Sequence, residues 1–130
     1  MQLATPLDVQ TTISGREALI EVAGELDIDT APVLRMAISE CMHKPLDDLA
    51  IDVRGVSFCD CSGLNALIHA RTWARDAGVR FRLLHPRRQL ANLLTATGTA
   101  QLFRTPDEPP AEGAVLPPRM SRDQEVRTFP

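Results

Sequence analysis

The chain has 130 residues, a length that suits one domain and is too short for two of ordinary size. Its apolar fraction of 44% is enough for a packed core, and its net charge of −3 lacks the basic excess that is typical of nucleic-acid binders. No apolar run approaches the roughly 20 residues that span a bilayer, and residues 1–6 lack the basic start of a secretory signal. We therefore expect a cytoplasmic protein, with its three cysteines as free thiols, that binds neither nucleic acid nor a membrane.

The first part of the chain predicts two strands and a helix. Apolar and polar residues alternate over residues 7–14, which is typical of a half-buried strand, and a turn then leads into a returning strand at 18–23. A helix is expected to begin at Asp29 or Thr30, either of which can cap it, and to stop at Pro45. Its expected core stripe is Val33, Leu34, Ala37, Ile38 and Cys41.

The second part predicts a strand at 49–53, a polar corner at 60–63 and a helix that ends near Gly78. A strand at 79–83 and a helix at about 87–97 follow, and the apolar residues 102–103 form either a short last strand or a hydrophobic latch. From residue 105 on, prolines and charges replace core residues. The segment 105–130 is therefore predicted to be a disordered, proline-rich tail, because it cannot bury enough apolar area to offset the entropy of ordering it.

This order of elements predicts an α/β fold. The first two strands form a hairpin, and the later strands are linked through helices, so they should run parallel with right-handed crossovers. The expected architecture is a small mixed sheet of four to five strands covered by about three helices.

A hydroxyl group stands at the corner between the third strand and the second helix, in the segment Asp60-Cys61-Ser62-Gly63-Leu64. The start of a helix has unpaired backbone N–H groups and partial positive charge, so a phosphate on Ser62 would be received there. We interpret Ser62 as a phosphorylation switch. The alternative is that Ser62 is an ordinary helix cap, and Asp60 is the other candidate for that role.

Three stretches of the chain, in order and at ordinary spacing, resemble one known family. They are residues 24–32, which contain Gly24-Glu25-Leu26-Asp27, residues 51–64, which contain the Ser62 corner, and residues 90–103. Together they resemble the STAS domain in its stand-alone form, the bacterial anti-sigma factor antagonist. The resemblance assigns residues 7–104 to a STAS domain.

The resemblance implies a function. In the family, the serine directly before the loop glycine is the phosphate acceptor, and here that residue is Ser62. The unmodified antagonist binds an anti-sigma factor that is also a serine kinase, and so releases a sigma factor. Phosphorylation by that kinase, with Mg-ATP, ends the binding, and a separate serine phosphatase restores it. The antagonist itself is expected to be no enzyme and to need no cofactor or metal.

The resemblance also suggests which residues surround the switch. Asp60, Gly63 and Asp27 are expected to shape the site, with Gly63 leaving the backbone open to a kinase. Leu64 and Asn65 are expected on the partner-binding surface. Asp27 could instead simply close a turn. Cys61 departs from the family pattern, which usually has Ser there, and can alter kinase preference.

Two other functions compete with this reading. The first is a STAS interaction subunit of another assembly, for stress signalling or lipid transport, without control by phosphorylation. The second is a thiol-based sensor or small enzyme that uses Cys59 and Cys61. Their spacing is poor for zinc, and alternation along an extended segment would place both side chains on one face, which favours packing as their role.

Overall fold

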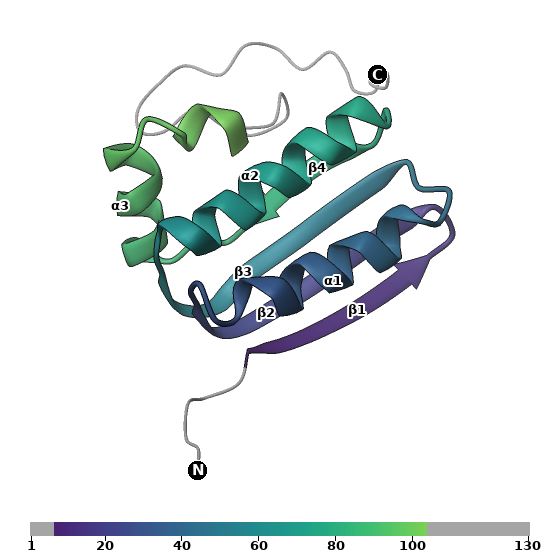
Figure 1. Cartoon of the computed structure of the whole chain (residues 1–130). Coiled ribbons are helices and arrows are strands. Elements are labelled where there is room, and N and C mark those ends of the chain that lie inside the picture. The colour runs from purple at the N-terminus through teal and green to yellow at the C-terminus, as the bar shows by residue number, and fades with distance from the viewer. Residues whose placement is uncertain (1–6, 104–130) are drawn as a thin grey trace.

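The computed structural model describes residues 7–103, and the predicted tail lies outside them. Four strands form one mixed sheet in the order β1-β2-β3-β4 (Figure 1). β1 (Asp8–Ser14) pairs antiparallel with β2 (Glu17–Leu26), and β3 (Asp48–Cys59) and β4 (Arg80–Leu84) continue the sheet in parallel. The predicted hairpin and the predicted mixed sheet are confirmed, with four strands.

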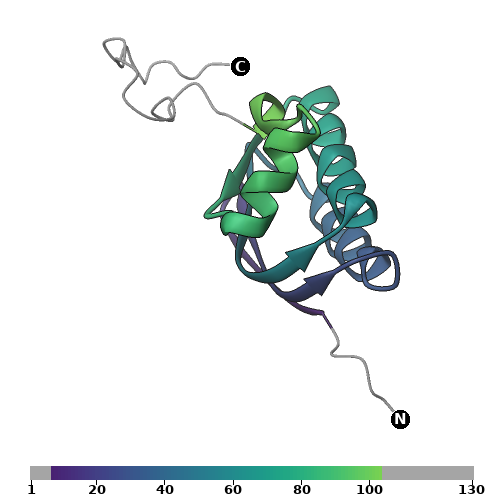
Figure 2. The same cartoon turned by 90° about the vertical axis from the view of Figure 1, so that its left-hand side faces the viewer.

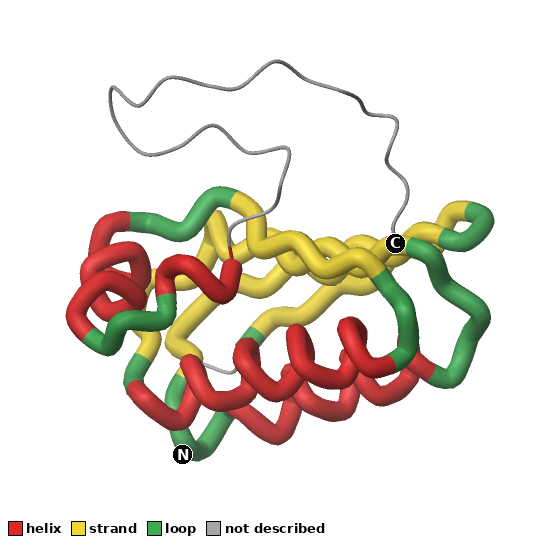
Figure 3. Tube along the Cα trace, turned by 90° about the horizontal axis from the view of Figure 1, so that it is seen from above, coloured by secondary structure: helices red, strands yellow, loops and turns green. Residues whose placement is uncertain are grey.

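Two long helices cover one face of this sheet. These are α1 (Ala31–Met42) and α2 (Cys61–Asp76), which lie side by side in a single layer (Figures 2 and 3). The shorter α3 (Arg88–Ala96) lies at the end of the sheet where α2 begins, and the 3-10 helix η1 (Ala100–Phe103) follows it. Among residues 7–103, no helix is long and apolar enough to cross a membrane.

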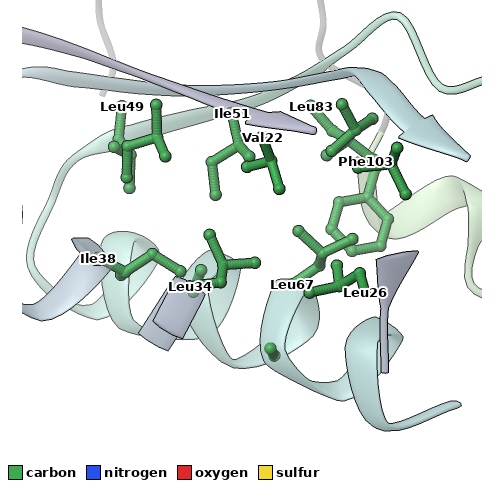
Figure 4. Close-up of a cluster of buried hydrophobic side chains, with 14 of the residues drawn as sticks. Val22, Leu26, Leu34, Ile38, Leu49, Ile51, Leu67, Leu83 and Phe103 are labelled. Carbon is green, nitrogen blue, oxygen red and sulfur yellow. The ribbon is translucent and has the colours of Figure 1, made fainter. Parts of the chain in front are cut away.

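The core lies between the sheet and these two helices (Figure 4). Alternate residues of β2 and β3 point toward the helices, because side chains of a strand alternate between its two faces. Ile20, Ile51 and Val53 are fully buried in this way. Figure 4 shows Leu34 of α1 and Leu67 of α2 on the helical side of the core, opposite Val22 and Ile51 of the sheet. The apolar pattern of the sequence therefore becomes the inner surface of a two-layer domain.

The opposite face of the sheet carries charged side chains. Asp48 of β3 and Arg82 of β4 form an ion pair of 3.2 Å across this face, and Asp52 lies 3.6 Å from the guanidinium of Arg54. These residues alternate with the buried ones along the same strands, as half-buried strands require.

The structure corrects two expectations from the sequence and decides between two alternatives for a third segment. β3 runs to Cys59, well beyond the predicted end at residue 53, because Gly55 lets the backbone pass within contact distance of Ala23 on β2. Val33 is 46% exposed and lies outside the core stripe of α1. The apolar residues 102–103 belong to a 3-10 helix whose Phe103 is buried, so they act as a latch and form no strand.

Candidate functional site

The two loops that the sequence analysis singled out meet at one end of the sheet. Parallel strands β2 and β3 both end there, and each leads directly into a helix. The N–H of Asp60 donates to the carbonyl of Leu26 over 3.2 Å, so the end of β3 is bound to the end of β2. The start of α2 consequently lies against the loop that precedes α1.

Asp60 is the cap of α2. Its carboxylate oxygen accepts hydrogen bonds from the N–H of Ser62 at 2.9 Å and of Gly63 at 3.1 Å. These two donors are among the groups that a helix start leaves unpaired, and a carboxylate there also interacts favourably with the helix dipole. The interpretation of Ser62 as the cap is therefore wrong, since Asp60 occupies that position.

Asp27 closes the neighbouring loop by the same pattern. Its carboxylate accepts from the N–H groups of Asp29 at 3.0 Å and Thr30 at 3.1 Å, two and three residues further on. Thr30 precedes α1 but does not cap it with its side chain, because its hydroxyl donates instead to the carbonyl of Glu25 at 2.7 Å. Asp27 therefore closes a turn, which is the alternative role that the sequence analysis gave it.

Ser62 is the second residue of α2, and its side chain is partly exposed. With the cap supplied by Asp60, the hydroxyl of Ser62 makes no hydrogen bond to any of residues 7–103. A partly exposed hydroxyl without an internal partner is chemically available for esterification. This is the property that a phosphate acceptor needs.

Gly63 and Leu64 are both less accessible to solvent than the sequence analysis expected. Leu64 is buried and so does not belong to an exposed partner surface, whereas Asn65 is exposed as predicted. Gly63, which was expected to shape the site, is also buried. A Cβ on Gly63 would lie 2.5 Å from the carbonyl oxygen of Leu26 and 2.9 Å from the sulfur of Cys59. Glycine is required there for close packing between α2 and the strand ends, and not to open the backbone to a kinase.

The two loop cysteines have opposite environments. Cys59 is buried, and burial raises the pKa of its thiol to about 12, with smaller contributions from Asp60 and Cys61. Cys61 is exposed. The expectation that both lie on one face is wrong, because the strand ends at Cys59 and α2 already begins at Cys61. A thiol with so high a pKa is a poor nucleophile, which argues against a redox role for Cys59.

Three residues near the loops were not expected from the sequence. Ile28 is 69% exposed in the loop before α1, and Phe58 is 43% exposed near the end of β3. Gln89 of α3 forms hydrogen bonds with the backbone of Cys59. Exposure of large apolar side chains is a signal of binding surfaces, but no local pattern in the sequence distinguishes these two from core residues.

The hollow that the structure contains beside α1 lies away from Ser62. Its volume is about 390 Å³, and it lies at the opposite end of the sheet, between β1 and the end of α1, and is lined by Thr11, Ile13, Glu40, Cys41, His43 and Lys44. Among residues 7–103, no three His, Cys, Asp or Glu side chains come together as metal ligands.

Comparison with known proteins identifies the fold. The sequence model of the family described as "Mlab, STAS domain" matches residues 9–104. The crystal structure of an anti-sigma factor antagonist from Mycobacterium paratuberculosis superposes with a TM-score of 0.67 and 23% identity, over 78% of this chain and 87% of that one. Comparison with curated protein sequences gives no match.

The antagonist SpoIIAA is similar in two states. Its unphosphorylated form gives a TM-score of 0.64 at 21% identity, over 73% of this chain and 84% of that one. The phosphorylated form of the Bacillus protein gives a TM-score of 0.60 at 21% identity, over 73% of this chain and 87% of that one. The family model matches residues 9–104, nearly the whole of the described part, and this chain belongs to the STAS domain family.

Proposed function

We propose that this protein is an anti-sigma factor antagonist that is switched by phosphorylation of Ser62. In its unmodified form it binds an anti-sigma factor with serine kinase activity in the cytoplasm, and so releases a sigma factor. The kinase transfers the γ-phosphate of Mg-ATP to the oxygen of Ser62, with loss of the hydroxyl proton and of ADP. A serine phosphatase restores the hydroxyl by hydrolysing the phosphoserine with water, which releases inorganic phosphate. In this role the chain is a binding partner and a phosphate acceptor, and it catalyses no reaction itself.

The observation that carries the proposal is the environment of the Ser62 hydroxyl. It is partly exposed, it has no hydrogen bond within residues 7–103, and it stands beside the exposed Cys61. The similarity to SpoIIAA, which is known in an unphosphorylated and a phosphorylated form, supports the same switch here.

Asp60 changes how the switch is expected to act. A phosphate on Ser62 would find the N–H groups of Ser62 and Gly63 already bonded to the Asp60 carboxylate. These two N–H groups, which the sequence analysis expected to receive the phosphate, are therefore already engaged. The phosphate adds about −1.5 to −2 charges next to that carboxylate, so the dominant effect is a concentrated negative charge on the partner surface.

Binding of two Ser62 variants to the kinase-type anti-sigma factor tests the proposal. Ser62→Asp should bind about tenfold more weakly, or worse, than Ser62→Ala in calorimetry, because an added negative charge loses affinity for an acidic or an apolar partner surface. Thr95→Asp, on the exposed side of α3, carries the same extra charge away from the loop and should bind as the wild type does. Equal affinities for both Ser62 variants would show that the switch does not act through this residue.

A STAS interaction subunit of another assembly, without control by phosphorylation, is the second candidate. It is favoured by the matching family model, whose description names Mlab and no antagonist. Mass spectrometry of the protein from its own cells separates the two candidates. Phosphate on Ser62 in any growth condition supports the switch, and its absence in all conditions supports the second candidate.

A further inference from the structure

The end of β3 has no neighbouring strand on the side of β4. β4 stops at Leu84, which is paired with Asp52, while β3 continues to Cys59. Beyond Asp52, the backbone groups of β3 on that side need other partners, because an unpaired N–H or C=O away from water costs free energy. Cys59 is the last residue of β3 and lies directly before the cap of α2.

The side chain of Gln89 takes the place of the missing strand at Cys59. The N–H of Cys59 donates to the Oε1 of Gln89 at 2.8 Å, and the Nε2 of Gln89 donates to the carbonyl oxygen of Cys59 at 2.9 Å. A carboxamide has the same donor and acceptor as a peptide group, so one side chain satisfies both backbone groups of Cys59. Both distances lie within the normal range for N–H···O hydrogen bonds.

From this geometry we infer that Gln89 is a positioning residue for Ser62. Gln89 holds Cys59 from one side, and the carbonyl of Leu26 holds Asp60 from the other, at 3.2 Å. Asp60 in turn binds the N–H groups of Ser62 and Gly63. The place of the acceptor hydroxyl is thus set by two anchors, one on β2 and one on α3.

This arrangement also links α3 to the switch. α3 is attached to the domain through Leu90 and Leu94, which are buried, and its start has no side-chain cap hydrogen bond. Gln89 stands in the first turn of α3, so a displacement of this turn breaks the contacts with Cys59. The role of Gln89 in phosphorylation rests on the proposed function. The contact between Gln89 and Cys59 can be tested on the isolated protein, without any partner.

Hydrogen exchange followed by NMR tests the anchor. Gln89→Met keeps the volume and helix propensity of the side chain but removes both hydrogen bonds. The amides of Cys59, Ser62 and Gly63 should then exchange about tenfold faster, because their local opening becomes easier. Asn92→Met places the same side chain on the same helix at an exposed position and should leave these amides unchanged. Unchanged exchange in Gln89→Met would overturn the inference.

Thiol labelling distinguishes a loosened loop from a less stable domain. Cys41 and Cys59 are both buried and the pKa of each thiol is raised, chiefly by burial, so each reacts only after the structure around it opens. Cys41 lies in the last turn of α1, at the opposite end of the sheet from Cys59, and reports opening of the domain there. In Gln89→Met, labelling of Cys59 should rise while that of Cys41 stays constant. An equal rise at both cysteines would reduce Gln89 to a general stabilising residue and overturn the inference.

Phosphorylation in the cells that produce the protein gives the functional readout. The fraction of Ser62 that carries phosphate should change in Gln89→Met and stay as in the wild type in Asn92→Met. A looser loop with an unchanged phosphorylated fraction would overturn the role of Gln89 in positioning Ser62. A wild-type chain that never carries phosphate on Ser62 would instead overturn the proposed function, while the exchange and labelling results would still decide whether Gln89 anchors the loop.

Discussion

Gly63 lies where the first turn of α2 crosses the end of β2. Its missing side chain leaves the space that the carbonyl oxygen and side chain of Leu26 and the sulfur of Cys59 occupy. The backbone of the loop can approach the strand ends this closely only because no Cβ intervenes. The residue directly after Ser62 is therefore packed against the strand ends.

Gly63→Ala should destabilise the domain by about 1–3 kcal/mol or more, since the new methyl group would overlap backbone that cannot move freely. Urea unfolding measures the change. Asn65→Ala, at an exposed position two residues further on, should stay within about 0.5 kcal/mol of the wild type. A Gly63→Ala protein as stable as Asn65→Ala would mean that α2 can shift away from β2 at little cost.

Asp60 illustrates how one side chain serves both the fold and the switch. Its carboxylate satisfies two backbone donors of α2, so the hydroxyl of Ser62 is released from the capping role that serine often takes. The same carboxylate is the nearest fixed negative charge in the sequence to a phosphate on Ser62. Both properties follow from the position of Asp60 directly before α2.

At the scale of the elements, α1 buries its predicted core stripe except for Val33. Leu34 and Ile38 are buried, whereas Val33 and Met36 are 46% and 64% exposed. The helix has more apolar residues than one buried stripe can hold, so spacing alone does not say which of them face the sheet. The remaining apolar residues, Val33 and Met36, lie on the side of α1 that faces away from the sheet.

Two alanine variants test this orientation of α1. Leu34→Ala should lower the free energy of unfolding by about 2–5 kcal/mol, because it leaves a cavity in the core. Val33→Ala, at the adjacent position, should change it by no more than about 0.5 kcal/mol. Urea denaturation of both variants gives the comparison, and similar losses in the two would contradict the buried position of Leu34 or the exposed position of Val33.

For the whole molecule, the described domain closes at Phe103. Phe103 is buried, and its ring packs against that of Phe81 on β4 with the ring centroids 6.0 Å apart. η1 thus closes the end of the core near the β4 edge of the sheet. Residues 104–130 lie outside the described part, and the division of the chain at residue 104 stays a prediction.

Truncation tests that division. A chain that lacks residues 105–130 should unfold at the same urea concentration as the full chain, since the pairing of all four strands is complete before them. A chain that also lacks 100–104 should lose about 3–5 kcal/mol, because Phe103 is removed from the core. A clear loss of stability in the first variant would show that the last segment packs on the domain.

By itself, the sequence determined the α/β class, the order of strands and helices, the hairpin and the polar corner at Ser62. These follow from periodicity and from turn and cap residues, which act between near neighbours in the chain. The family resemblance, carried by three short stretches, pointed to the STAS fold, and the match over residues 9–104 confirmed it.

Only the tertiary structure decided how that corner is held. Gly63 meets Leu26, and Gln89 meets the backbone of Cys59, across 30 residues or more of sequence. The burial of Leu64, the exposure of Val33 and the contrast between Cys59 and Cys61 were likewise settled by packing. Such contacts join residues that are distant in the chain, and a local pattern does not specify which distant surface its side chains will meet.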